Sequence, residues 1–179
     1  MHKWRFYGGL IMVDNKAIVK VISRITKNNG APCKKTLQKI VFLIEAKHVD
    51  LGCDYGIHFY GPYSADLDFA VRELNDEGIL KIDYTPMEHL ISVVGDSFEN
   101  GNINPTVNEV IDEFSKETPS ELELIATALY VYLQVKDVSR IKTEVIKIKG
   151  SKYSVSTPAV KSTVRTYVSP SFSSTPSFR

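Results

Sequence analysis

The sequence predicts a mostly helical α+β protein, and three observations support this fold class. Apolar residues recur at helical spacing in four segments, capping residues indicate two further helices, and two short segments favour a β-hairpin. The 179 residues are 43% hydrophobic and 24% charged, the composition of a soluble globular protein. A chain of this length buries a substantial core as one domain, or as one small domain with a helical extension.

The first two predicted helices each have one apolar face. Asp14 or Asn15 can cap a helix that runs to about residue 28, where Asn29-Gly30 permits a left-handed turn. Its inward stripe is Ile18, Val21, Ile22 and Ile25, and its opposite stripe is Lys16, Lys20, Arg24 and Lys27. A second helix is expected over residues 34–49. Its inward stripe is Leu37, Ile40, Val41, Ile44 and His48.

A strand, a turn and a third helix are expected next. Residues 55–60 are aromatic and alternate as in a short strand, and Gly61-Pro62 is typical of a turn. Ser64 is a favourable N-cap for a helix that ends at Gly78. Its inward residues are Leu67, Val71 and Leu74.

Two strands, over residues 79–84 and 90–94, are predicted to form a hairpin around Thr85-Pro86. The resulting order is helix, helix, strand, helix, hairpin. This is the order of a winged helix, a variant of the helix-turn-helix that carries a β-wing. We therefore expect a winged-helix-like N-terminal half.

The rest of the chain predicts a helical C-terminal half and a tail. A polar linker over residues 95–104 precedes a helix that starts at Asn104-Pro105. Thr118-Pro119-Ser120-Glu121 is a capping box for the next helix, and Ser139 can cap a last one that ends near Gly150. The expected organisation is an extension (1–13), a winged-helix-like domain (14–95), a helical subdomain (96–150) and a disordered, Ser/Thr/Pro-rich tail (151–179).

The net charge of +1 conceals three segregated blocks. Residues 1–49 carry ten basic and two acidic residues, a net of +8. Residues 50–135 carry three basic and seventeen acidic residues, a net of −14, and residues 136–179 carry nine basic and two acidic, a net of +7. The acidic block covers the third helix, which a winged helix usually places against DNA. Because phosphates repel such a face, insertion of this helix into the major groove is not expected.

Cysteine usage and hydropathy predict a cytoplasmic protein. Cys33 and Cys53 are too few for a disulfide framework, and we expect them to be free thiols in a reducing compartment. The apolar run from Gly8 to Val13 is too short for a signal peptide or a membrane span.

Three motifs resemble a bacterial protein family when they are taken in order. They are Leu37-Gln38-Lys39 on a helix, Tyr60-Gly61-Pro62 in a turn, and the helix end from Leu74 to Gly78. The segment from about residue 14 to 150 resembles the YwgA-type group and is more distantly similar to the Panacea (SocA-like) antitoxin domain. The Panacea resemblance implies that the chain neutralises a toxin by direct contact, in some cases as an adaptor to a protease. That family would continue into another helix near Lys152, where a Ser/Thr/Pro-rich stretch follows here.

The predicted partner-binding surface comprises the tyrosines of the Tyr60–Ser64 turn and the outer face of the third helix. Its residues are Tyr60, Tyr63, Asp66, Phe69, Arg72, Glu73 and Asp76, with Asp68 and Glu77 on the same acidic face. Two interpretations stay open for the turn, because Gly61, Pro62 and Ser64 also have structural uses. Phe69 is either an anchor for a basic partner or a residue buried under the C-terminal helices.

A second surface is the basic one formed by the first two helices. Its residues are Lys16, Lys20, Arg24, Lys27, Lys34, Lys35 and Lys39. They could contact phosphates, or they could be solvated or complement the acidic middle of the same chain.

Neither a metal site nor an active site is expected. His48, Cys53 and His58 lack zinc-site spacing, and no nucleophile elbow or Gly-rich phosphate loop is present. No cofactor, membrane or small-molecule substrate is implied. The predicted function is a cytoplasmic, non-enzymatic interaction module, similar to an antitoxin or adaptor, that binds a protein partner such as a basic toxin. The alternative is a DNA-binding regulator that uses the basic first two helices and the wing.

Overall fold

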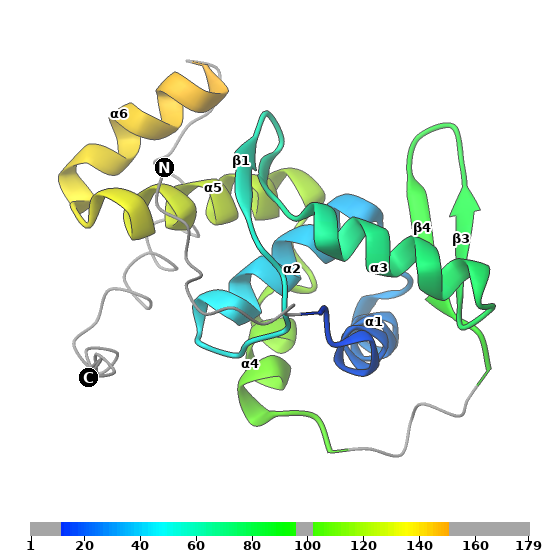
Figure 1. Ribbon diagram of the computed structural model, residues 1–179. Helices are drawn as coiled ribbons and strands as arrows, with labels where there is room; N and C mark the ends of the chain where they lie inside the picture. Colours follow the sequence, from blue (N-terminus) through cyan, green and yellow to red (C-terminus); the bar gives the residue numbers. More distant parts are fainter. Residues whose placement is uncertain (1–11, 96–101, 151–179) are drawn as a thin grey trace.

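The computed structural model describes residues 12–95 and 102–150 of the chain (Figure 1). Within these residues it contains six helices and two antiparallel hairpins, which confirms the predicted mostly helical α+β class. The helices are α1 (Asn15–Asn29), α2 (Lys34–Ala46), α3 (Ala65–Asp76), α4 (Pro105–Phe114), α5 (Pro119–Val135) and α6 (Val138–Lys149). The strands are β1 (Gly56–His58), β2 (Gly61–Tyr63), β3 (Leu80–Tyr84) and β4 (His89–Val93).

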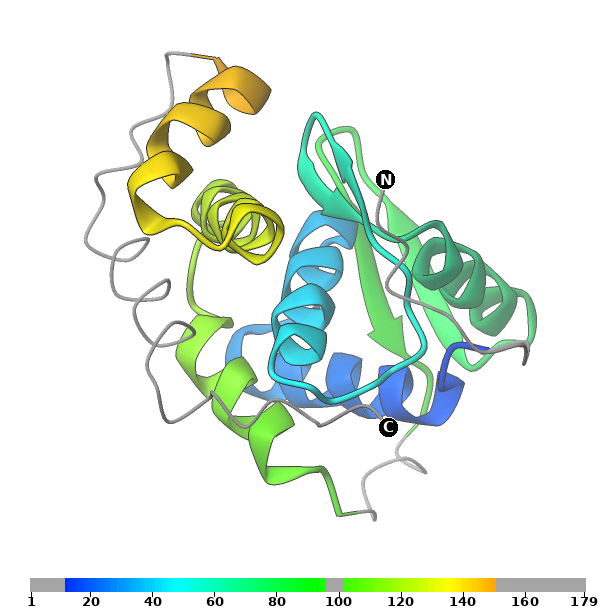
Figure 2. The ribbon, with the colours of Figure 1, turned by 60° about the vertical axis from the view of Figure 1, so that its left-hand side comes forward.

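Helix α2 is the centre of the molecule. It has α5 and α6 on one side and α3 with the β3–β4 hairpin on the other (Figures 1 and 2). Every residue from Thr36 to Ile44 is buried, so that α2 is enclosed around its whole circumference. One hydrophobic core runs from Ile18 of α1 through α2 to Val145 of α6, and the two halves of the chain share it.

Most helix starts are those that the sequence predicts. The side chain of Asp14 accepts a hydrogen bond from Ala17 N at 3.0 Å, and that of Ser64 accepts one from Leu67 N at 3.2 Å. The Thr118–Glu121 capping box is present at the start of α5. Helix α6 is capped by Asp137 instead of the expected Ser139. These starts are predictable because a cap and its N–H partner are neighbours in the sequence.

The strand predicted over residues 55–60 is present as the shorter β1, but the turn predicted at Gly61-Pro62 is wrong. The chain reverses at Phe59-Tyr60, and Gly61–Tyr63 forms the returning strand β2, in which Gly61 pairs with His58 and Tyr63 with Gly56. Proline is tolerated in β2 because a two-stranded hairpin makes few demands on its backbone nitrogen. The hairpin projects beside α2 and α5 (Figure 1).

Helix α2 ends three residues earlier than predicted. The N–H groups of Lys47 and His48 donate to Ile44 O and Glu45 O, at 3.0 and 2.9 Å, and close the helix with a tight turn. His48 then takes a left-handed conformation, with φ 63°, and is exposed. Its predicted place on the inward stripe is therefore wrong.

The β3–β4 hairpin confirms the strands predicted around Thr85-Pro86. At its tip Thr85 N donates to Glu88 O at 3.0 Å. In the middle of β4, Ile91 N donates to Pro32 O at 2.9 Å, and Cys33 forms an isolated bridge with Leu90. The segment before α2 thus pairs with the outer edge of β4 at Pro32 and Cys33.

Some predictions fall on residues that the structure does not describe. The N-terminal extension up to residue 11, the linker residues 96–101 and the Ser/Thr/Pro-rich tail from residue 151 lie outside the described ranges. Among the helices of residues 12–95 and 102–150, none combines the length and apolar character that crossing a membrane requires.

Candidate functional site

A buried amide fixes the returning strand β2 on helix α2. The side chain of Gln38 donates from Nε2 to Ser64 O and accepts at Oε1 from Ser64 N, and both distances are 2.9 Å. This pair of bonds imitates a β-ladder and satisfies the backbone of a buried residue. It also holds the start of α3, because Ser64 is the N-cap of that helix.

Lys39, one turn from the start of α2, is only 2% exposed. Its Nζ donates to Pro62 O at 2.6 Å. Burial lowers the pKa of this ammonium to about 8, although the carboxylate of Glu123 acts in the opposite direction. The predicted assignment of Lys39 to an exposed basic surface is therefore wrong.

Glu123 of α5 joins α2, α5 and α6. Its carboxylate accepts a hydrogen bond from Lys149 at the end of α6, and it lies 3.1 Å from Nζ of Lys35. Lys149 also donates to Phe59 O at 2.5 Å, so that α6 holds the tip of the β1–β2 hairpin. Burial raises the pKa of Glu123, but the hydrogen bonds from Lys149 and Lys35 outweigh it and hold the pKa below its usual value.

Gly61 permits the hairpin to approach α5 closely. Its φ is +86°, in the left-handed region. A Cβ at this position would lie 2.7 Å from Thr127 Oγ1 and 3.3 Å from Glu123 O. Only glycine satisfies both the conformation and the space here.

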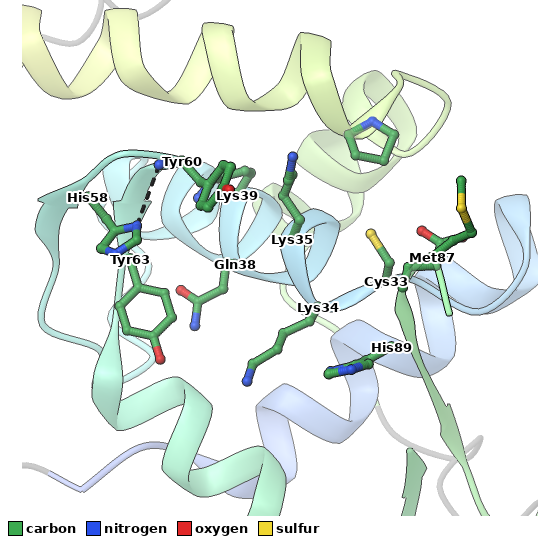
Figure 3. A pocket seen from close by; sticks show the side chains of 12 residues that line it. Cys33, Lys34, Lys35, Gln38, Lys39, His58, Tyr60, Tyr63, Met87 and His89 are labelled. Carbon is green, nitrogen blue, oxygen red and sulfur yellow. Dashed lines mark hydrogen bonds between the residues drawn. The ribbon is translucent and has the colours of Figure 1, made fainter. Parts of the chain in front are cut away.

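These contacts form one wall of an open groove of about 560 Å³ (Figure 3). The first turns of α2 form its floor and carry Lys34, Lys35 and Lys39. His58, Tyr60 and Tyr63 line it from the β1–β2 hairpin, and Met87, Glu88 and His89 line it from the tip of the β3–β4 hairpin. The volume lies within the roughly 300–1,000 Å³ that small-molecule sites occupy.

The outer face of α3 is a second candidate surface. Asp66, Phe69, Arg72, Glu73 and Asp76 are all exposed on it, as the sequence predicts. Phe69 is 63% exposed, so the interpretation that the C-terminal helices bury it is wrong. The expected exposure of Asp68 is also wrong, because this carboxylate is buried between Lys34 and Arg72.

The two tyrosines do not join the α3 face as one surface. Tyr60 is exposed at the hairpin tip, and Nζ of Lys35 lies 5.1 Å from the centre of its ring. Tyr63 is partly buried, and burial together with the charge and hydrogen bond of Asp68 raises the pKa of its phenol. Both rings belong to the groove.

The basic residues of the first two helices are distributed over several elements. Arg24 is bonded to Asp112 of α4 at 2.7 Å, Lys34 pairs with Asp68 of α3, and Lys35 pairs with Glu123 of α5. Lys16 and Lys27 are exposed and Lys20 is half-buried. Three of the seven residues therefore neutralise acidic residues of the middle of the chain.

The groove and the residues that support its wall could not be predicted from the sequence. The residues that Gln38, Glu123, Thr127 and Lys149 contact at the groove wall lie far away in the sequence. One signal was available: residues 37–44 are apolar except for Gln38 and Lys39, and a helix that is apolar on all sides is buried. Polar residues inside such a run must find buried partners.

The described residues provide little support for a metal centre. Residues 12–95 and 102–150 contain no group of three His, Cys, Asp or Glu side chains placed to hold an ion.

Cys33 and Cys53 are buried free thiols, and burial together with the charges of Glu45 and Asp66 raises the pKa of Cys53 to about 12. This thiol is therefore protonated and a poor nucleophile.

Comparison with known proteins gives one informative similarity. The chain is 28% identical over 128 residues to YwgA of Bacillus subtilis (strain 168), an uncharacterised protein, and the match covers 67% of this chain and 75% of YwgA. The chain is similar to YwgA. No protein-family model matches the chain. The likeness supports the YwgA-type resemblance of the three motifs and carries no function with it.

Proposed function

We propose that this chain is a cytoplasmic protein-interaction module that binds a basic protein partner through the outer face of α3 and catalyses no reaction. The observation that carries the proposal is the exposure of Phe69, at 63%, on an otherwise charged helix face. Aromatic residues, phenylalanine among them, are enriched at the buried centre of protein interfaces, so this ring is a candidate anchor for a partner. Covering it would contribute about 2 kcal/mol to binding.

The charge around Phe69 indicates the kind of partner. Asp66, Glu73, Asp76 and Glu77 are exposed on this face against Arg72, a net of −3. Arg72 is itself paired with the buried Asp68 at 2.5 Å, which reduces its effect on an approaching molecule. A basic surface would be attracted to this face, and the attraction would act mainly on the association rate.

The distant resemblance to the Panacea domain suggests a class of partner for this face. A toxin that acts on RNA commonly carries a basic surface, and the acidic α3 face is complementary to such a surface. We infer an antitoxin- or adaptor-like role in which contact with the partner is itself the activity.

Regulation of transcription by DNA binding is the second candidate. A winged helix is compatible with the order helix, helix, hairpin, helix, hairpin. It is also compatible with the backbone pairing of Pro32-Cys33 with β4. The geometry favours the protein partner because Arg24, Lys34 and Lys35 are engaged by acidic residues of the chain and Lys39 is buried. A gel shift with a promoter fragment, for example that of its own gene, discriminates the two. The regulator requires binding that weakens steeply with salt.

Purification of the tagged protein from its native host tests the protein-binding proposal. We expect a stoichiometric basic partner with the wild type and its loss with Phe69→Ala. The control is Val138→Ala, which removes another exposed apolar side chain, on α6. A partner that binds both variants equally, or the absence of any stoichiometric partner, contradicts the proposal.

A charge reversal tests the acidic part of the same face. Glu73→Lys should slow association with the partner at least tenfold at low salt, whereas Glu113→Lys on the exposed side of α4 should leave the rate within twofold. Equal rates for both variants contradict the assignment of binding to α3.

A further inference from the structure

The groove beside α2 contains more positive than negative charge. Each of its two supporting carboxylates is shared between two cations: Asp68 contacts Lys34 and Arg72, and Glu123 contacts Lys35 and Lys149. Both carboxylates are buried behind the groove wall, with exposed fractions of 6% and 3%. Lys34 and Lys35 are only half-buried and both line the groove, Lys34 directed toward α3 and Lys35 toward α5 (Figure 3).

Lys39 adds a third cation, and no carboxylate of the described residues forms an ion pair with it. An ammonium carries three N–H donors, and Pro62 O accepts one of them. Lys39 nevertheless lines the groove. Lys34 and Lys35 lie on the first turn of α2 and Lys39 about one turn further on, and among the described residues that line this cavity Glu88 is the only acidic one.

The walls of the groove are aromatic and apolar. Tyr60 and Tyr63 stand on one side, and Met87, which is 93% exposed, stands on the other (Figure 3). His58 packs between the two tyrosine rings, with centroid distances of 5.9 Å to each. Flat rings and a flexible thioether are typical walls for a planar apolar body.

We propose that this groove binds a small organic anion, in which an aromatic body lies against Tyr60 and Tyr63 and an oxyanion is held by Lys35 and Lys39. Phosphoryl and carboxylate groups share the required chemistry, since both accept several charge-assisted hydrogen bonds. The site is separate from the α3 face and does not depend on the proposed protein partner.

Titrations with four simple probes test the ligand class. Phenyl phosphate, benzoate, phenol and benzylamine are added to the full chain, and binding is followed by the NMR chemical shifts of the groove residues. We expect saturable shifts with phenyl phosphate, benzoate or both, and at least tenfold weaker binding of phenol and benzylamine. The two anions distinguish a phosphoryl from a carboxylate ligand. Inorganic phosphate is a fifth probe, and binding as tight as that of phenyl phosphate contradicts the aromatic part of the proposal.

A double substitution tests the assignment to the lysines. Lys34→Gln with Lys35→Gln leaves Asp68 with Arg72 and Glu123 with Lys149. Because each buried carboxylate keeps one cation, we expect the fold to be preserved. The matched control is Lys16→Gln with Lys142→Gln, which removes two exposed lysines outside the groove. We expect at least a tenfold loss of anion affinity in the groove variant and less than a twofold change in the control.

Tyr60→Ala tests the aromatic wall independently. It should weaken phenyl phosphate binding severalfold and leave inorganic phosphate binding unchanged. Two results overturn the proposal: phenol binding as tightly as the anions, or full anion affinity in the Lys34→Gln, Lys35→Gln variant with an unchanged melting temperature.

Discussion

Nζ of Lys39 donates a hydrogen bond to the carbonyl oxygen of Pro62 at 2.6 Å, inside the protein and 23 residues away along the chain. This bond connects the central helix to the returning strand of the β1–β2 hairpin. The bond places a charged ammonium inside the protein, and removing a charge from water costs free energy. The cost of that burial and the position of the hairpin are therefore coupled.

The first prediction concerns the pH dependence of this lysine. Because its pKa falls from 10.5 to about 8 on folding, the unfolded chain binds more protons between these values, and stability rises with pH there. The free energy of unfolding is lowered most below pH 8, where Lys39 is buried in its charged form. Between pH 7 and 10 the wild type should gain about 2 kcal/mol of unfolding free energy relative to Lys39→Met.

Denaturant titrations of the two proteins at pH 7, 8, 9 and 10 measure this difference. Lys16→Met, at an exposed position, serves as the control and should run parallel to the wild type. A constant difference between Lys39→Met and the wild type over this range would show that the lysine is not buried as described.

The second prediction concerns the close approach of Gly61 to α5. Gly61→Ala should destabilise the protein by about 2–4 kcal/mol, because it adds left-handed strain to a contact with Thr127 Oγ1 that has no room for a Cβ. Gly56→Ala, in the paired strand, meets nothing within 4 Å and should change stability by less than about 0.5 kcal/mol. Thermal unfolding compares the two, and equal losses contradict the assigned packing.

The third prediction concerns Glu123. Its replacement by Gln leaves Lys35 and Lys149 without their shared carboxylate, and we expect a loss of about 3 kcal/mol of unfolding free energy at pH 7. Glu113→Gln, on the exposed side of α4, should have no measurable effect. A Glu123→Gln protein as stable as the wild type is inconsistent with a buried ionic cluster.

The fourth prediction concerns the reactivity of Cys53. Burial and nearby carboxylates raise its pKa to about 12, so that only about one molecule in 10⁴ carries the thiolate at pH 8. Native protein should show no iodoacetamide modification of Cys53 over an hour, whereas protein in guanidinium should react fully. Mass spectrometry of the digest measures both. Rapid native labelling would mean that the thiol is accessible.

The features that could be predicted from the sequence are those decided by neighbouring residues. The Asp14, Ser64 and Thr118–Glu121 caps and the turn around Thr85-Pro86 depend on contacts within three residues. Phe69, Glu73 and Asp76 could be placed on one face by helical projection, whereas Asp68, predicted on the same face, is buried. Their exposure, in contrast, depends on whether another element covers that face.

The features that could not be predicted depend on residues that are distant in the sequence. Lysine is usually found at the protein surface, so the residue type alone does not indicate that Lys39 is buried. Its burial arises because α5 and the hairpin pack over α2. The β1–β2 hairpin was missed because Gly61-Pro62 favours a turn locally, whereas the contact with α5 and the bonds to Gln38 and Lys39 fix it as a strand. The groove likewise forms because the β1–β2 hairpin packs against α2 and α5.

The central claim is that the α3 face, with Phe69 as its anchor, binds a basic protein partner. The most direct measurement is quantitative mass spectrometry of the tagged protein purified from its native host as wild type, Phe69→Ala and Val138→Ala in parallel. We expect one basic protein at a stoichiometric ratio with the wild type and Val138→Ala, and its loss from Phe69→Ala. Retention of the same protein by Phe69→Ala at the wild-type ratio, or no stoichiometric protein with any of the three, would contradict it.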